Sequence, residues 1–150
     1  MKHRALAFAL CLGLSAMAQA QVTVTQAWVR ATVPAQKTTG AYMEIRSAEN
    51  ARLVGASSPA AKIVELHEMA MENNVMKMRA VKSLALPAGK PVQLKPGGYH
   101  FMMVDLAKPL KKGDVIPITL TIEGNDRKRQ RVEVRAEVRD LAAPAASHGH

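Results

Sequence analysis

The sequence alternates hydrophobic and polar residues one by one in several stretches, which is the pattern of half-buried β-strands. Aliphatic residues occupy every second position in residues 116–122 and again in residues 132–138. Between them, Gly124-Asn125-Asp126 supplies residues that favour a turn. The two stretches therefore predict an antiparallel hairpin with one face on the core and the other in solvent. Its tip carries the basic run at residues 127–131, which we expect to be a solvated turn that keeps sheet edges from pairing; docking on an acidic partner is the alternative.

Shorter stretches of the same alternation occupy residues 22–26 and 41–46, and residues 52–56 are expected to be a further short strand, with turn-forming residues between these stretches. Residues 82–99 contain three Pro and three Gly, so we expect this segment to cross between layers of the fold. Strands recur about every eight to twelve residues and no helical periodicity of useful length is present, which favours an all-β antiparallel sandwich. Trp28, the largest apolar side chain, is expected to fill its core.

Four of the nine methionines lie at positions 69–78, on both sides of Asn73-Asn74. Asn tolerates the left-handed backbone conformation, so this pair can form the type I′ turn of a tight hairpin. The predicted cross-strand pairs are then Glu72 with Val75, Met71 with Met76, Ala70 with Lys77, and Met69 with Met78. His67 would share one face with all four methionines, diagonal to Met78 at about 7 Å.

A second pair of the same two residue types, His100 and Met102, follows at i, i+2 spacing. Residues two apart in a strand share a face, so each place offers one imidazole and one thioether. The candidate metal ligands are therefore His67, Met78, His100 and Met102. Thioether sulfur is neutral and soft, which favours Cu(I), whereas zinc would be expected to recruit Cys or carboxylates. Met69 is a further candidate, either as an auxiliary ligand or as a hand-over residue that holds the ion briefly during its transfer.

The order of these four residues resembles the motif of the periplasmic copper chaperones called PCu(A)C, whose four motif side chains bind Cu(I). Ten residues separate His67 from Met78, twenty-one separate Met78 from His100, and one separates His100 from Met102. The resemblance covers about residues 22–140 and includes WVRAT (28–32), GAYM (40–43), LPAG (86–89), LKPGGYH (94–100) and KPLKKGD (108–114). It implies a cupredoxin-like Greek-key β-sandwich with copper at one end. It also implies delivery of Cu(I) to the copper centre of a respiratory cytochrome oxidase, directly or through another chaperone.

Residues 1–20 have the composition of a signal peptide. The segment begins with Lys2-His3-Arg4, continues with an apolar run at residues 5–14, and ends in the small residues Ala18-Gln19-Ala20. We therefore expect cleavage near Gln21, export to the periplasm, and no integral membrane segment in the mature chain.

Cys11 lies inside the apolar run, and residues 8–10 do not resemble a lipoprotein box, so we expect it to be removed with the leader. The mature copper-binding domain, residues 21–140, would then contain no cysteine. That excludes disulfides and the thiolate ligand that a blue-copper electron carrier needs.

Removing Lys2 and Arg4 from the 21 basic residues leaves 19 against 12 acidic ones, a net charge of about +7. Such an excess speeds encounter with an anionic partner or membrane surface. Stacking aromatics do not accompany the basic residues, so we expect no nucleic-acid partner. The expected state is a monomer that meets a copper-accepting protein, either an oxidase copper domain or another copper chaperone.

Residues 141–150 are rich in Ala and Pro, and we expect them to be a disordered tail. His148 and His150 flank Gly149, a spacing that would let the tail collect a second ion, Cu(II) or zinc, through imidazole nitrogens.

Other functions stay open at this point. A copper or zinc hydrolase or oxidase needs an open coordination position and a general base; Glu65 and Glu68 are the nearby carboxylates, and Glu68 should point away from His67. A metal-free interaction module would use the methionines as adaptable surface. Periplasmic copper storage, resistance or uptake would need the same site as delivery.

Overall fold

The computed structural model describes residues 21–140, and ten β-strands and no helix make up this part of the chain. The strands are β1 (Val22–Arg30), β2 (Thr38–Ser47), β3 (Ala51–Ser57), β4 (Ala61–Glu72), β5 (Val75–Ala80), β6 (Leu84–Leu86), β7 (Pro91–Leu94), β8 (His100–Leu106), β9 (Val115–Gly124) and β10 (Arg129–Arg139). Over this range the chain has no helix long and apolar enough to cross a membrane. The expected signal peptide, and the tail with His148 and His150, lie outside the described residues.

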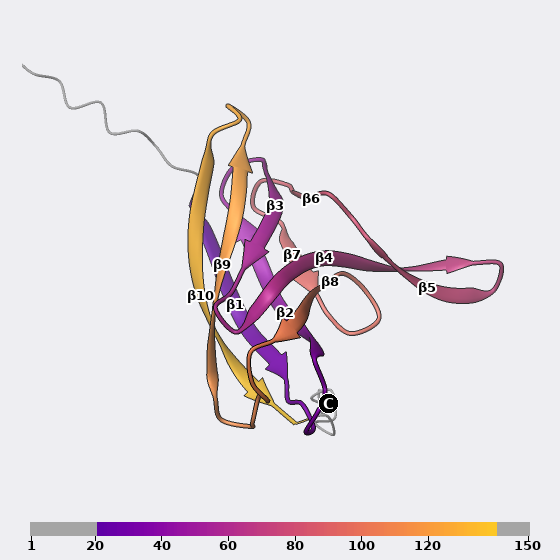
Figure 1. Ribbon diagram of the computed structural model, residues 1–150. Helices are drawn as coiled ribbons and strands as arrows, with labels where there is room; N and C mark the ends of the chain where they lie inside the picture. The colour runs from indigo at the N-terminus through magenta and orange to yellow at the C-terminus, as the bar shows by residue number, and fades with distance from the viewer. Residues whose placement is uncertain (1–20, 141–150) are drawn as a thin grey trace, which may run out of the picture.

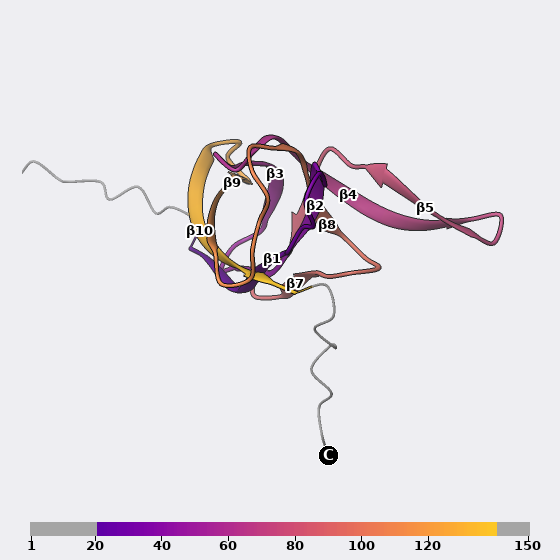
Figure 2. The ribbon, with the colours of Figure 1, turned by 60° about the horizontal axis from the view of Figure 1, so that its bottom comes forward.

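The strands join one sheet that curls round a common core (Figure 1). Its order is β5-β4-β8-β2-β1-β10-β9-β3-β6, and β7 pairs with β2 off this path. Figure 2 shows β3, β9 and β10 on one side of the core and β2, β4 and β8 on the other. The predicted all-β sandwich is confirmed. Among the described strands, β1 and β10 form a parallel pair, where the prediction had antiparallel pairing throughout.

The core is aliphatic, and the last hairpin contributes much of it. On β9, the four isoleucine and leucine side chains predicted to face inward are at most 5% exposed: Ile116, Ile118, Leu120 and Ile122. They lie opposite Ala136, Val134, Val132 and Gln130 on β10, respectively. The predicted hairpin is therefore confirmed, with its charged residues on the outer face.

Trp28 does not fill the core, so the expectation from its size was wrong. Gln26 has a φ of 54°, and the register between β1 and β2 shifts between Thr25 and Trp28. A bulge of this kind reverses which alternate residues face inward. Val29 is therefore fully buried, while Trp28 lies on the opposite face with its ring centroid 4.5 Å from that of Tyr42.

The segment at residues 82–99 crosses between the two sides of the core, as expected, but it also forms two strands that the sequence did not predict. β6 pairs with β3 on one side, and β7 pairs with β2 on the other. The turn after β7 contains Gly97 at a φ of +84°, a conformation that favours glycine. This turn brings the chain into β8, between β4 and β2.

β4 and β5 form a long hairpin that extends away from the body of the molecule (Figure 1). Asn73 and Asn74 have φ values of 50° and 61°, as a type I′ turn requires. The register matches the sequence prediction, with Glu72 opposite Val75, Met71 opposite Met76, Ala70 opposite Lys77, and Met69 opposite Met78. Only the first part of β4 pairs with β8, so the distal half of the hairpin has no sheet neighbour on its β8 side.

Candidate metal centre

Three neighbouring strands present the predicted ligands on one face of the sheet. His67 on β4 lies opposite His100 on β8, and Met69 on β4 lies opposite Met78 on β5. Met102 follows His100 by two residues and therefore shares its face, opposite Glu65. Backbone pairing alone thus places residues more than thirty positions apart on one surface.

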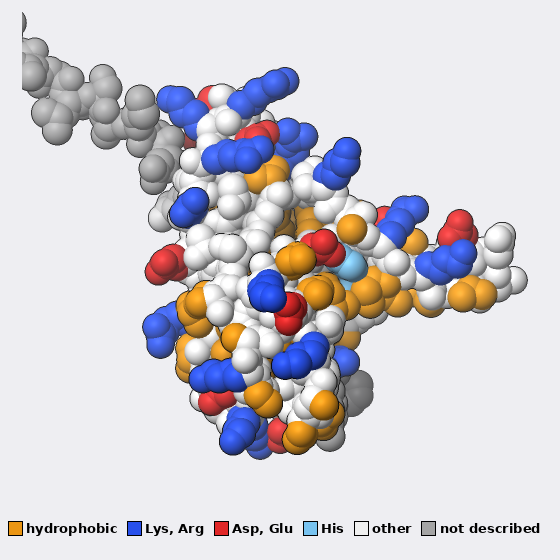
Figure 3. All heavy atoms as spheres, viewed as in Figure 1, with side chains coloured by type: hydrophobic (Ala, Val, Ile, Leu, Met, Phe, Trp, Pro, Cys, Tyr) orange, Lys and Arg blue, Asp and Glu red, His pale blue; other side chains and the backbone are white. Residues whose placement is uncertain are grey.

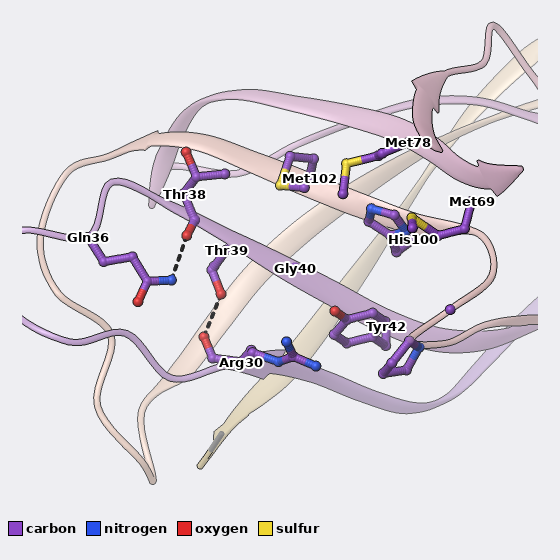
Figure 4. Close-up of a pocket in the computed structure, with 12 residues that line it drawn as sticks. Arg30, Gln36, Thr38, Thr39, Gly40, Tyr42, Met69, Met78, His100 and Met102 are labelled. Atoms are coloured by element: carbon purple, nitrogen blue, oxygen red, sulfur yellow. Dashed lines mark hydrogen bonds between the residues drawn. The ribbon is translucent and has the colours of Figure 1, made fainter. Parts of the chain in front are cut away.

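Met78, His100 and Met102 line one cavity of about 450 Å³, together with Met69. Figure 4 shows these four side chains directed towards the same space. The rest of the lining is mostly polar and comes from the β1–β2 region, beside β8 in the sheet, and from the turn before β8: Arg30, Gln36, Thr38, Thr39, Gly40, Tyr42, Pro96 and Gly97. Three of the four predicted ligands and the auxiliary candidate are therefore brought together.

His67 does not line this cavity but lies next to it, with its ring centroid 5.9 Å from that of His100. Its Nε2 is 2.9 Å from Glu65 Oε2. A carboxylate only accepts hydrogen bonds, so in the neutral ring Nε2 carries the hydrogen and Nδ1 the lone pair. Nδ1 is buried and has no hydrogen-bond partner among residues 21–140. An unpaired buried polar atom is costly, and a bound metal ion would satisfy it.

In His100 the ring nitrogen that keeps its lone pair is Nε2, not Nδ1 as in His67. The side chain is only 4% exposed, and its Nδ1 is 3.1 Å from the carbonyl oxygen of Gly98. Because a carbonyl accepts, Nδ1–H donates this bond, and the lone pair of the neutral ring is on Nε2. The turn before β8 therefore fixes both the orientation and the tautomer of His100.

The donors gathered here are neutral: two imidazoles and three thioethers. Among the described residues, no group of three or more His, Cys, Asp and Glu side chains is placed to hold a metal ion. A neutral set with several sulfurs suits a soft monovalent ion, and Cu(I) is the common ion of that kind in proteins. The ligand roles of His67, Met78, His100 and Met102 stay a prediction.

Sequence reasoning assigned no site role to Tyr42, Gly40 or Arg30. The Tyr42 ring lies 6.3 Å from the His100 ring, and the Arg30 guanidinium lies 5.8 Å above Tyr42. A Cβ on Gly40 would overlap the Tyr42 hydroxyl and lie 2.8 Å from its Cζ, so Gly40 makes room for this ring. Glu65 was considered from the sequence only as a candidate general base. Its contact with His67 was not predicted, and the i, i+2 spacing of the two residues is the signal that could have indicated it.

Comparison with known proteins places the chain in a family. Residues 22–138 match the family described as "Putative lipoprotein LpqE-like". A curated relative, "Putative lipoprotein Lxx21020" of Leifsonia xyli subsp. xyli (strain CTCB07), is 37% identical over 102 residues. That alignment covers 66% of this chain and 60% of the relative, so the chain spans less than two thirds of the relative's length.

Solved structures show the same architecture. The copper-bound PCuAC domain from PmoF2 is 24% identical, with a TM-score of 0.64 over 79% of this chain and 92% of that one. The Cu(I) form of DR1885 from Deinococcus radiodurans is 31% identical, with a TM-score of 0.56 over 85% of each chain. The chain therefore belongs to the LpqE-like family, and its fold is the cupredoxin-like β-sandwich of PCuAC domains.

Proposed function

We propose that the protein is a periplasmic copper chaperone that binds one Cu(I) through His67, Met78, His100 and Met102. It passes the ion to the copper centre of a respiratory cytochrome oxidase or to a factor that assembles that centre. The domain that does this is residues 21–140, and it acts as a monomer.

One observation carries the proposal: soft and imidazole donors from three strands converge on a single face. Met78, His100 and Met102 line one cavity, and His67 beside it holds a buried nitrogen with no partner in the described chain. The donor set is neutral and rich in sulfur, which matches Cu(I) better than zinc or a hard cation.

The relatives support copper as the ion. The Cu(I) form of DR1885 aligns over most of both chains, and the PCuAC domain of PmoF2 has a copper-bound structure. The lipoprotein names of the family and of the Leifsonia relative support export, in agreement with the leader-like composition of residues 1–20.

The exposure of the donors suits delivery. His100 is nearly buried, whereas Met78 on the projecting hairpin is 46% exposed. A partner can therefore replace the Met78 thioether first, while the other ligands still hold the ion. Each exchange keeps the copper bound, so transfer needs no free ion.

A carrier also fits the geometry better than an enzyme does. A hydrolase would need a free carboxylate as general base near the metal. Glu65 is the carboxylate on this face, and its Oε2 already accepts a hydrogen bond from His67 Nε2. Glu68 points to the opposite face and pairs with Arg79 at 2.7 Å.

Competition with a chromophoric Cu(I) chelator tests the site. Wild-type protein should take up one tightly held equivalent. Replacing Met78 and Met102 together with Leu keeps apolar volume but removes both sulfurs. We expect the affinity to fall by more than the roughly 10- to 100-fold that loss of an outer-shell partner costs. The matched control replaces Met43 and Met103, both buried in the core, with Leu.

The control variant should bind as wild type does. Equal affinity in wild type and in the Met78→Leu, Met102→Leu variant would refute the ligand assignment. Transfer from loaded protein to a purified oxidase copper domain, followed by absorbance, then separates delivery from copper storage, resistance or uptake, because a storage protein would keep its ion.

A further inference from the structure

The hairpin of β4 and β5 carries more thioethers than the four-ligand site uses. Its methionines form two cross-strand pairs on one face: an inner pair, Met69 with Met78, and an outer pair, Met71 with Met76. The inner pair lines the cavity. The outer pair lies two residues further along each strand, about 7 Å from the inner one.

The turn sets how closely each pair approaches. With Asn73-Asn74 as a two-residue loop, Glu72 and Val75 close the turn as a hydrogen-bonded pair. Pairs alternate along an antiparallel ladder, so both methionine pairs are of the non-hydrogen-bonded kind. Side chains are closest in such pairs, with Cα atoms about 4.5 Å apart. Two long, flexible thioethers can then meet on one ion.

The outer pair is exposed, with Met71 at 65% and Met76 at 45%. Side chains so exposed add little to a hydrophobic core, which is the usual role of Met in a sheet. Figure 3 shows hydrophobic side chains along the edge of the projecting hairpin, leading to a histidine at its base. The outer pair therefore continues the row of cavity thioethers along the hairpin into solvent.

The other face of the hairpin holds the charges. Glu68 pairs with Arg79 at 2.7 Å, and Glu72 pairs with Lys77 at 3.1 Å. These ion pairs cross between the two strands without involving the methionines. The methionine face is left without a carboxylate beyond Glu65, so towards the tip its donors are soft ones.

We propose that Met71 and Met76 form a second, weaker binding site for Cu(I), from which the ion moves by exchange of thioether ligands to Met69 and Met78 and then into the cavity. This rests on the function proposed above, because copper is the ion that the cavity is proposed to carry. A docking surface for a partner protein is the competing use of exposed methionines. Leu or Ile would serve docking equally well, whereas a soft-metal site needs sulfur at both positions of the pair.

The test uses Ag(I), a redox-inert soft monovalent ion, and NMR of the full chain labelled at the methionine methyl groups. The first equivalent should shift the signals of Met78 and Met102. The second equivalent should shift those of Met71 and Met76. Chelator competition should give two bound ions, the second held more weakly.

The Met71→Leu, Met76→Leu variant keeps exposed apolar side chains of similar size, and circular dichroism checks its fold. It should lose the second ion and keep the first. The Met43→Leu variant, altered in the core, should bind both ions.

Met71 and Met76 signals that stay unmoved at two equivalents would overturn the second site. A variant that binds as many ions as wild type does would also overturn the second site. If that variant also transfers copper poorly, the result assigns the outer pair to docking. Failure of the four-ligand site would give a different result. The first equivalent would then leave the Met78 and Met102 signals unshifted, whether or not the Met71 and Met76 signals move.

Discussion

The two histidines of the site are held by different partners and present different nitrogens. His67 gives its Nε2–H to Glu65 and leaves Nδ1 buried and unpaired among the described residues. His100 gives its Nδ1–H to the carbonyl of Gly98 and leaves Nε2. A ligand whose second nitrogen is held in this way keeps one tautomer and one ring orientation. The acceptors Glu65 and Gly98 would therefore hold the rings in place for the proposed ion.

Removing the Glu65 carboxylate should weaken copper binding without removing a ligand. In Glu65→Ala, the His67 ring loses the acceptor that orients it, so the Cu(I) affinity should fall roughly 10- to 100-fold with unchanged stoichiometry. Chelator competition measures it. The matched control is Glu68→Ala on the opposite face, whose surface pair with Arg79 contributes little. Equal affinities in the two variants would show that Glu65 does not position His67.

At the scale of elements, the hairpin of β4 and β5 decides which side chains meet. The left-handed conformations of Asn73 and Asn74 fix the register, and the register places Met69 opposite Met78. A slip of one residue between β4 and β5 would turn Met76 and Met78 to the charged face, away from Met69 and Met71. The ribbon has little other support, because β5 pairs with β4 alone among the described strands. The turn therefore matters more here than in a hairpin packed on a core.

Asn74→Ala should loosen the hairpin, because the left-handed region costs an ordinary residue about 1–2 kcal/mol. We expect faster hydrogen exchange at the β4–β5 amides and weaker Cu(I) binding, with little change in the rest of the sandwich. Asn74→Gly is the control, since glycine adopts this conformation freely. Identical exchange in the Ala and Gly variants would contradict the role given to the turn.

At the scale of the whole molecule, a group of three charged residues links strands at the end of the sandwich near the β9–β10 turn. Glu123 is 11% exposed and lies on β9 between Arg52 of β3 and Arg129 of β10, at 2.7 and 3.2 Å. Hydrogen bonds from Arg52 and Arg129 hold the pKa of Glu123 below its usual value of 4.5. This carboxylate therefore joins three strands as long as it is ionised.

The stability that Glu123 provides should depend on pH. Its pKa is lower in the folded than in the unfolded chain, so the stabilisation is present above 4.5 and is lost as the pH falls through the folded value. The Tm of Glu123→Gln should lie below that of wild type at neutral pH, and the difference should close in acid. Glu133→Gln, at an exposed carboxylate without an ion pair among residues 21–140, is the control. A difference that is constant with pH would contradict this account.

The sequence predicted the strands and turns better than it predicted which side chains face the core. Strict alternation gave the β9–β10 hairpin, and Asn73-Asn74 gave the register of β4 and β5, because both signals are local. The inward direction of Trp28 was wrong because one extra residue in β1 reverses the facing of the side chains after it. Such a bulge leaves no mark in the hydrophobic pattern at Gln26-Ala27.

Prediction of the site has the same limit: ligand spacing can be read from the sequence, but contacts between distant strands cannot. Ligand types and spacing pointed to four residues, and pairing of β4 with β8 and β5 brings them onto one face. The polar wall with Arg30 and Tyr42 comes from β1 and β2, far away in the sequence. Only the order of strands in the sheet brings that wall to the cavity, and hydrophobic periodicity does not encode strand order.

X-ray absorption at the copper edge of protein loaded with one equivalent of Cu(I) tests the central claim most directly. The account predicts a shell of mixed nitrogen and sulfur scatterers, and a smaller sulfur contribution in the Met78→Leu, Met102→Leu variant, where Met69 is the thioether left in the cavity. A wild-type shell of nitrogen and oxygen without sulfur would contradict it.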